Sequence, residues 1–201
     1  MHLGIDFDNT IVCYDALFHR VGVEGGLIPR DLPASKSEIR NYLRQIGCED
    51  DWTVMQGYVY GARMREAKPF SGVLDCLCAC HAEGIELSVI SHKTRYPYLG
   101  ERYDLHGAAL AWLEQQGFFD PARIGLSRDR TFFELTKEAK LQRIGQCGCT
   151  HFIDDLPEFL LEPGFPPGAR RILFDPNDHY PDAAQYLRVR GWATVVTALM
   201  A

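Results

Sequence analysis

The chain of 201 residues is 46% apolar and 24% charged, with a formal net charge of -6. This composition is ordinary for a globular protein of one or at most two domains. The acidic balance disfavours a nucleic-acid polymer as partner, because such partners require a basic face, and no apolar run approaches the ~20 residues of a membrane span.

An apolar segment at the beginning of the chain predicts a buried strand over residues 2–8. No basic start or cleavage site precedes it, so we expect a cytoplasmic protein without a secretory signal. The strand runs out at Asp6 and Asp8, in the sequence GIDFDNTIV. Side chains two residues apart on a strand point to the same side. Neighbouring carboxylates repel and are costly to desolvate, so something must compensate their charge.

The next segment, residues 13–68, contains a Gly- and Pro-rich loop and two helical patterns, over residues 34–47 and 50–67. It leaves the first strand and returns at residue 69, near where it began. We therefore predict a small helical cap over residues 13–68, inserted into a core domain that comprises residues 1–12 and 69–201. The alternative is that these helices belong to the layers of the core.

The rest of the chain alternates helical patterns, over residues 71–84, 106–117 and 136–148, with apolar strands over 85–91, 150–153 and 170–175. Gly84 and Gly117 follow two of the helices, and Thr136 is a plausible N-cap of the third. Strands that alternate with helices predict an α/β fold with an open, parallel, Rossmann-like sheet covered by helices on both faces.

Seven cysteines, an odd number, are expected to be free thiols. Three of them lie in the run CLCAC of the predicted helix 71–84. There Cys76 and Cys80 share one face and Cys78 points elsewhere, so the run cannot close a tetrahedral metal site by itself. We expect these cysteines to act as small hydrophobic side chains.

Polar side chains end three of the predicted strands: Asp6 with Asp8, then Ser91, then Asp154 with Asp155. The carboxyl ends of parallel strands meet along one edge of such a sheet, where ligands bind. Mg²⁺ prefers oxygen ligands and keeps several waters. We therefore predict a magnesium site at this edge, which would neutralise the acidic groups and attract a phosphate.

The order of these motifs resembles the haloacid dehalogenase (HAD) superfamily of phosphohydrolases. The family's D-x-D-x-T motif is matched by residues 6–10, and its strand that ends in Ser or Thr by Ser91. Its lysine at the start of a helix is matched by Lys137, and its acidic pair by Asp154 and Asp155. The four motifs span residues 3–155, and the small helical insertion resembles that of the deoxyribonucleotidase branch.

The resemblance implies a role for each of these residues. Asp6 would be the nucleophile that forms an aspartyl-phosphate, and Asp8 the general acid and base. Ser91 would hold a phosphoryl oxygen, and Lys137 would neutralise charge on the transferring group. Lys140, one turn further along, is the alternative to Lys137, which we prefer because Leu141 and Ile144 follow it at apolar spacing. The metal ligands would be Asp6, Asp8 through its backbone carbonyl, Asp154 and Asp155.

The segment after Ser91 offers His92, Lys93 and Arg95 as candidate substrate contacts. A second anionic group of the substrate would suit the lysine and the arginine. We therefore predict a Mg²⁺-dependent phosphatase that hydrolyses a small phosphorylated metabolite, a nucleotide or a sugar phosphate. The alternatives are a non-catalytic phosphate-binding or regulatory protein with the same fold, and a phosphotransferase. The sequence predicts no oligomeric state.

Overall fold

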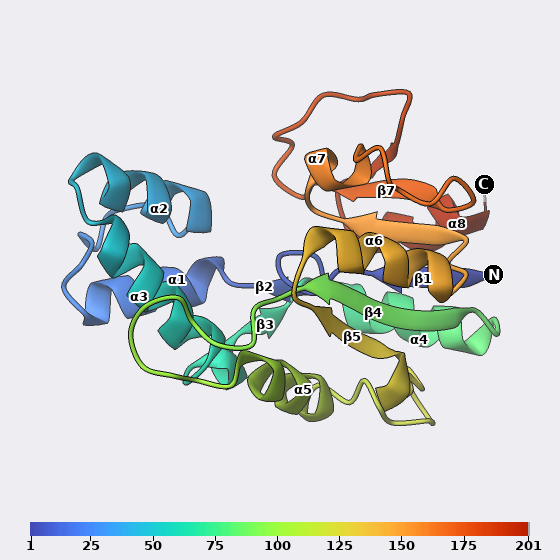
Figure 1. Ribbon diagram of the computed structural model, residues 1–201, viewed down its shortest axis with the longest axis horizontal. Helices are drawn as coiled ribbons and strands as arrows, with labels where there is room; N and C mark the ends of the chain where they lie inside the picture. The colour runs from blue at the N-terminus through green and yellow to red at the C-terminus, as the bar shows by residue number, and fades with distance from the viewer. Residues whose placement is uncertain (201) are drawn as a thin grey trace. The chain divides into compact units, whose positions relative to one another are not determined.

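A computed structural model describes residues 1–200 of the chain and divides it into two compact units (Figure 1). The core unit contains residues 1–12, residues 69–93 and the chain from residue 117 onward. The helical unit contains residues 13–68 and 94–116. Two short strands, β2 (Val12–Cys13) and β3 (Lys68–Pro69), pair where the chain passes between the units.

The core unit is built on a six-stranded sheet with the order β5-β4-β1-β6-β7-β8. All neighbouring strands are parallel, so their carboxyl ends lie along one edge. The strands are β1 (His2–Ile5), β4 (Glu86–His92), β5 (Thr131–Glu134), β6 (His151–Asp154), β7 (Arg170–Phe174) and β8 (Leu187–Val189). The predicted parallel α/β sheet is confirmed.

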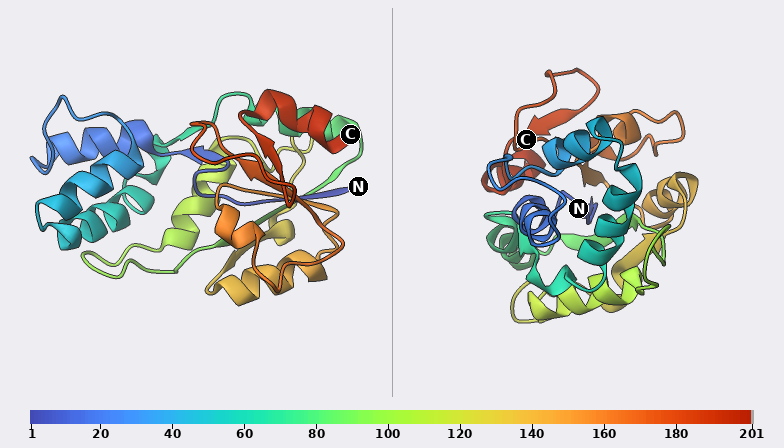
Figure 2. Two further views of the ribbon diagram at one scale, coloured as in Figure 1. Left: turned by 90° about the horizontal axis from the view of Figure 1, so that it is seen from above. Right: turned by 90° about the vertical axis from the view of Figure 1, so that its left-hand side faces the viewer.

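Helices cover both faces of this sheet, as predicted (Figure 2). On one face lie α4 (Val73–Ala82) and α8 (Val195–Met200), and on the other lie α6 (Lys137–Gln146) and α7 (Pro157–Leu160). The start of α6 is fixed by Thr136, whose side chain accepts a hydrogen bond of 3.1 Å from the backbone N–H of Ala139. This cap satisfies one of the helix's unpaired amides.

Close packing between β1 and β6 holds the middle of the sheet. A side chain at Gly4 would bring its Cβ to 2.6 Å from the ring of Phe152 and 2.8 Å from Sγ of Cys149. Phe152 in turn packs against Phe159 of α7 and against Phe165. The strand that leads to Asp6 is thereby held firmly against the strand that leads to Asp154.

The helical unit has a separate aromatic core. Its helices are α1 (Asp15–Glu24), α2 (Lys36–Gln45), α3 (Glu49–Tyr60), the 3₁₀ turn η1 (Met64–Glu66) and α5 (Leu105–Gln115). Phe18 of α1 stacks on Trp52 of α3 with 4.9 Å between ring centroids. Trp112 of α5 is buried and donates from its indole N–H to the carbonyl of Ala67, at 2.9 Å. Residues 94–116 therefore pack with residues 13–68; the function of this unit as a cap stays a prediction.

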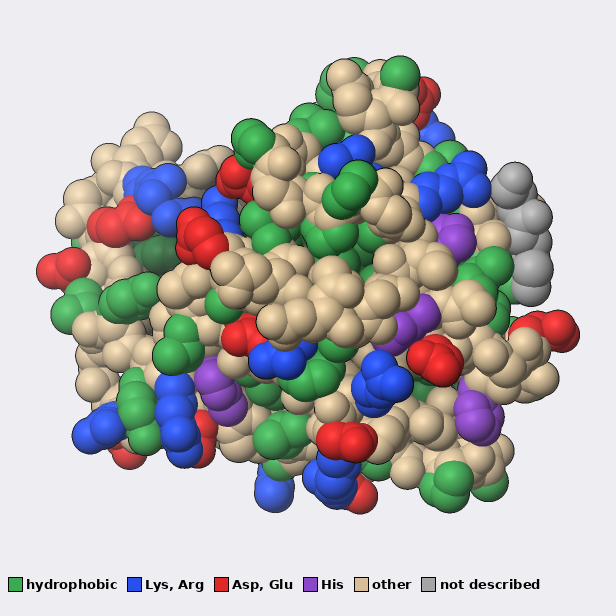
Figure 3. Space-filling view, turned by 45° about the vertical axis from the view of Figure 1, so that its right-hand side comes forward, with side chains coloured by type: hydrophobic (Ala, Val, Ile, Leu, Met, Phe, Trp, Pro, Cys, Tyr) green, Lys and Arg blue, Asp and Glu red, His purple; other side chains and the backbone are tan. Residues whose placement is uncertain are grey.

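The surface carries charges of both signs. On the face shown in Figure 3, Lys and Arg side chains lie next to Asp and Glu instead of gathering by sign. No helix within residues 1–200 combines the length and the apolar character that crossing a membrane requires.

Candidate active site

A tight turn after β1 presents both aspartates of the first motif at the carboxyl edge of the sheet. The backbone N–H of Asp6 donates to the carbonyl of Ile153, at 2.9 Å, and so continues the pairing of β1 with β6. Asn9 then adopts a left-handed conformation with φ of 59°, which asparagine tolerates better than most residues. The N–H groups of Ile11 and Val12 both return to the carbonyl of Phe7, at 3.1 Å, and close the turn.

Asp6 is the centre of a buried cluster that gathers three strands and one helix. Its Oδ1 accepts a hydrogen bond from Oγ of Ser91 on β4, at 2.9 Å, and one from Nζ of Lys140 on α6, at 2.6 Å. The same Nζ lies 2.6 Å from Oδ2 of Asp154 on β6. Asp6, Ser91 and Asp154, which the sequence predicts at one edge of the sheet, are therefore brought together.

The charges of this cluster perturb one another strongly. Burial raises the pKa of Asp6 to about 7; Lys140 opposes the rise, and Asp154 and Asp8 add to it. Burial alone would lower the pKa of Lys140, but Asp154 and Asp6 outweigh it, so the pKa of this lysine lies above its ordinary value. Lys140 therefore stays protonated, and one ammonium group only partly compensates the carboxylates around it.

The lysine that reaches Asp6 is Lys140, the alternative, and not Lys137. Lys137 is the first residue of α6 and its side chain is exposed. Lys140 is only 3% exposed and lies one turn further along, on the same side of the helix as the buried Ile144. Lys137 lies at the exposed start of the helix, and the role of either lysine in the reaction stays a prediction.

A second buried lysine, Lys93, pairs with Asp8. Its Nζ lies 3.0 Å from Oδ1 and 2.8 Å from Oδ2 of this aspartate. The side chain of Lys93 is 3% exposed and that of Asp8 is 19% exposed. Lys93 is predicted from sequence as a substrate contact, and no local sequence pattern indicates its pairing with Asp8.

The other two candidate substrate contacts are His92 and Arg95. His92 is exposed at the end of β4. Arg95 belongs to the helical unit, in which its guanidinium is 3.9 Å from Asp104 and lies over the ring of Tyr96. A role of Arg95 beside Ser91 stays a prediction.

The acidic pair after β6 is divided between the interior and the surface. Asp154 is fully buried, and its Oδ1 accepts a hydrogen bond of 2.9 Å from the backbone N–H of Leu156. Asp155 is half-buried. Asp154 shares the ammonium group of Lys140 with Asp6.

The oxygen atoms of the cluster suit a magnesium ion better than a softer metal. Across residues 1–200 there is no group of three or more His, Cys, Asp or Glu side chains that could hold a metal ion. Mg²⁺ does not require one, because it is commonly bound by one or two carboxylates, waters and substrate phosphates. Oδ2 of Asp6 receives no hydrogen bond from any described residue and is available to such an ion or to a substrate.

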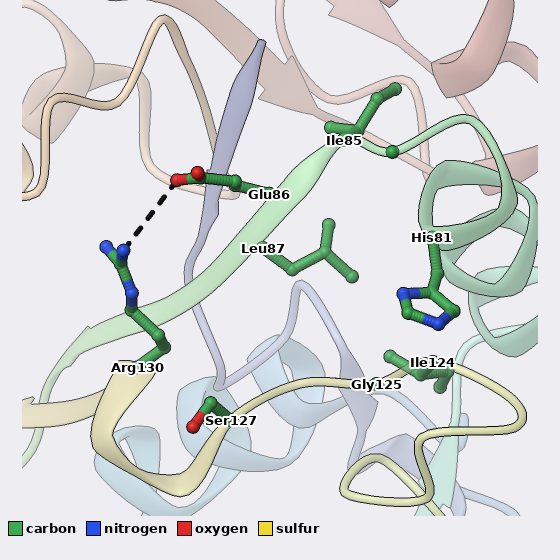
Figure 4. A pocket seen from close by; sticks show the side chains of 9 residues that line it. His81, Ile85, Glu86, Leu87, Ile124, Gly125, Ser127 and Arg130 are labelled. Atoms are coloured by element: carbon green, nitrogen blue, oxygen red, sulfur yellow. Dashed lines mark ion pairs between the residues drawn. The ribbon is translucent and has the colours of Figure 1, made fainter.

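A separate hollow of about 380 Å³ lies at the opposite end of β4 (Figure 4). Its apolar part is formed by Ile85, Leu87 and Ile124, and at its rim Glu86 pairs with Arg130 at 3.7 Å. Glu86 is the single carboxylate among its lining residues. The hollow therefore lacks the pair of acids on which the cluster around Asp6 is built.

Of the comparisons with known proteins, only the one with solved structures identifies the fold. No family model and no curated protein matches the sequence. Among solved structures, a HAD family hydrolase from Deinococcus radiodurans R1, with bound phosphate and sodium, has a TM-score of 0.58 at 17% identity; the match covers 98% of this chain and 94% of that one. A conserved haloacid dehalogenase-like protein of unknown function from Agrobacterium tumefaciens has a TM-score of 0.58 at 16% identity, over 99% and 97% of the two chains.

A third structure is that of the HAD-hydrolase candidate YfnB from Bacillus subtilis, bound to magnesium. Its TM-score is 0.54 at 14% identity, and the match covers 100% of this chain and 98% of that one. At such identities the likeness establishes the fold. This protein adopts the fold of the HAD-superfamily hydrolases over essentially its whole length.

Proposed function

We propose that this protein is a Mg²⁺-dependent phosphatase that hydrolyses small phosphate monoesters through an aspartyl-phosphate on Asp6. The observation that carries the proposal is the buried contact of Asp6 with Ser91 and with Lys140, which also contacts Asp154. It combines a carboxylate nucleophile, a hydroxyl donor and a fixed positive charge at the ligand-binding edge of a HAD-type sheet.

In the first step, an oxygen of Asp6 attacks phosphorus, and the bond between phosphorus and the ester oxygen breaks. Asp8 gives a proton to the departing oxygen, which leaves as an alcohol. In the second step, Asp8 takes a proton from water, the water oxygen bonds to phosphorus, and inorganic phosphate leaves Asp6 as a free carboxylate. Lys140 and Ser91 are placed to stabilise the charge on Asp6 and on the transferring group in both steps.

A count of charges supports a requirement for a divalent cation. Asp6, Asp8, Asp154 and Asp155 carry four negative charges when ionised, against two positive charges on Lys93 and Lys140. A phosphate dianion would therefore meet a net negative centre. When bound by Asp6 and Asp154, with Asp155 and the Asp8 carbonyl as further oxygen donors, Mg²⁺ would supply the missing positive charge and polarise a phosphoryl oxygen.

The bound species of two similar structures point in the same direction. The Deinococcus protein holds phosphate and sodium, and the Bacillus protein holds magnesium. Extended to this chain, these ligands match an anionic substrate and a cation at the carboxyl edge of the sheet. We propose that the substrate is a small cytoplasmic metabolite, a nucleotide or a sugar phosphate, and that the helical unit limits access of water during the reaction.

The experiment is a phosphate-release assay on purified protein with p-nitrophenyl phosphate and a panel of nucleotides and sugar phosphates, with Mg²⁺ and with EDTA. We expect Mg²⁺-dependent release, and its loss by at least about a thousandfold in Asp6→Asn, because the nucleophile is gone. Absence of turnover across the panel, combined with measurable phosphate binding, would favour a binding protein. Transfer of label to an added alcohol in preference to water would favour a phosphotransferase.

A further inference from the structure

We propose that Lys93 is a positioning residue that holds the carboxylate of Asp8 for proton transfer and does not bind the substrate's phosphate. The inference rests on the proposed function and assigns Lys93 a different role from the substrate contact expected from sequence. It starts from the geometry of the pair: one ammonium group lies within 3.0 Å of both carboxylate oxygens of Asp8.

The backbone of Lys93 is fixed by the sheet. Its N–H donates to the carbonyl of Glu134 at 2.9 Å, so the ladder between β4 and β5 continues one residue beyond β4. Its Nζ also lies 5.5 Å from the ring centroid of Phe7, which is fully buried. A lysine held at both ends in this way has little freedom to follow a substrate.

The same spacing at the ends of two neighbouring strands accompanies this contact. Asp6 and Asp8 follow β1 two residues apart, and Ser91 and Lys93 stand two residues apart at the end of β4. Both side-chain pairs, Ser91 with Asp6 and Lys93 with Asp8, join residues 85 positions apart in sequence. The carboxyl end of β4 therefore supplies a hydroxyl to Asp6 and an ammonium group to Asp8.

The two buried lysines divide the carboxylates between them. Lys140 contacts Asp6 and Asp154, and Lys93 contacts Asp8. Charge removed at Lys140 would affect the nucleophile, whereas charge removed at Lys93 would release the residue that moves protons. The consequence of losing Lys93 should therefore depend on how much the leaving group needs a proton.

This dependence gives the experiment. A p-nitrophenolate leaves readily without a proton, whereas an alkoxide does not, and general acid catalysis contributes about 10²–10⁴-fold where it is needed. We would measure kcat/KM, which reports the steps up to formation of the aspartyl-phosphate, for p-nitrophenyl phosphate and for propyl phosphate. In Lys93→Met we expect a loss of about a hundredfold or more with propyl phosphate, and of less than about tenfold with p-nitrophenyl phosphate.

Two further variants distinguish a positioning role of Lys93 from an effect on folding and from a simple effect of its charge. Lys93→Arg keeps the charge and should restore part of the activity on propyl phosphate. In an Asp8→Asn background, Lys93→Met should add little further loss, because the two residues act as one unit. Arg170→Met is the matched control: it removes an exposed positive charge at the amino-terminal end of β7, at the other edge of the same sheet, and should leave both substrates unaffected.

Each alternative result has a separate meaning. Equal losses on both substrates with a raised KM would make Lys93 a phosphate-binding residue and overturn the proposal, as would activity unchanged on both. Additive losses in the Asp8→Asn background would also overturn it. Absence of turnover by the wild-type protein on every phosphate ester would instead refute the proposed function itself.

Discussion

Replacing Lys140 with methionine removes one positive charge from the most buried ionic cluster of the core unit and should destabilise it strongly. The side chain of Lys140 is 4% exposed and lies 2.6 Å from one oxygen of each of two carboxylates, which are 7% and 0% exposed. Removal of one partner of a buried ion pair costs about 3–5 kcal/mol, because the other charge is left uncompensated. Methionine retains most of the aliphatic stem, so the change isolates the charge.

The loss of stability in Lys140→Met should increase as the pH rises. Lys140 lowers the pKa of Asp6, so without it this carboxyl group takes up a proton more readily and partly neutralises itself. We therefore expect a free energy of unfolding about 3–5 kcal/mol below that of the wild type at pH 8, and a smaller deficit at pH 6.

The measurement is urea unfolding in EDTA at both pH values, followed by circular dichroism. Lys137→Met is the matched control, because it makes the same substitution on the same helix at an exposed residue. Exposed substitutions usually change stability by less than about 0.5 kcal/mol. The reasoning fails if Lys140→Met costs less than about 1 kcal/mol, or if the two variants lose the same amount.

Three further predictions concern the core unit. Burial raises the pKa of Asp6 from 3.8 to about 7. The side chain of Asp6 therefore contributes stability to the fold below pH ~4, and this contribution is lost as the pH rises through 7. Asp6→Asn should therefore become more stable than the wild type, by up to about 4 kcal/mol, between pH 5 and pH 8 in EDTA; unfolding curves that diverge in the opposite sense would contradict this. Mg²⁺ at a hundredfold its Kd should stabilise the wild type by about 2.7 kcal/mol and Asp154→Asn much less; equal thermal shifts would place the ion elsewhere. Gly4→Ala should cost about 1–3 kcal/mol through its contact with Phe152, whereas Gly145→Ala in α6, which has room for a methyl group, should be neutral or stabilising.

The fold and the meeting of Asp6, Ser91 and Asp154 followed from topology that the sequence already specifies. Alternating strands and helices require a parallel sheet, and a parallel sheet gathers its strand ends along one edge. The strand β5 was not predicted, because it is only four residues long and half-buried throughout. Helix α1 was missed because its ten residues include an interior glycine and two β-branched valines, which weaken the local helical signal.

Residues 94–116 contain a helix that the sequence pattern predicts, but the pattern does not identify the segment against which this helix packs. A helix was expected near 106–117, and α5 spans Leu105–Gln115. This helix packs through the face that carries Trp112. The indole N–H of Trp112 donates to the carbonyl of Ala67 in the helical unit. An amphipathic helix specifies that it must be covered on one face and leaves open which segment covers it.

The choice between Lys137 and Lys140 depended on which apolar residue faces the sheet. Lys137 precedes Leu141 and Ile144 by four and seven residues, and Lys140 precedes Ile144 by four, so both lysines lie near the helix face that carries Ile144. In the structure Lys140 is buried, whereas Lys137, the first residue of the helix, is exposed. Sequence periodicity therefore could not separate the two alternatives.

The orientation of the buried lysines also favours an enzyme over a phosphate-binding protein. A site that only binds phosphate gains most when its ammonium groups point to the anion. Here Lys140 contacts Asp6 and Asp154, and Lys93 contacts Asp8, so both lysines support carboxylates. Keeping three carboxylates close together is costly, and a protein that only binds an anion gains nothing from that cost. This arrangement is what a nucleophile and a separate acid/base residue require.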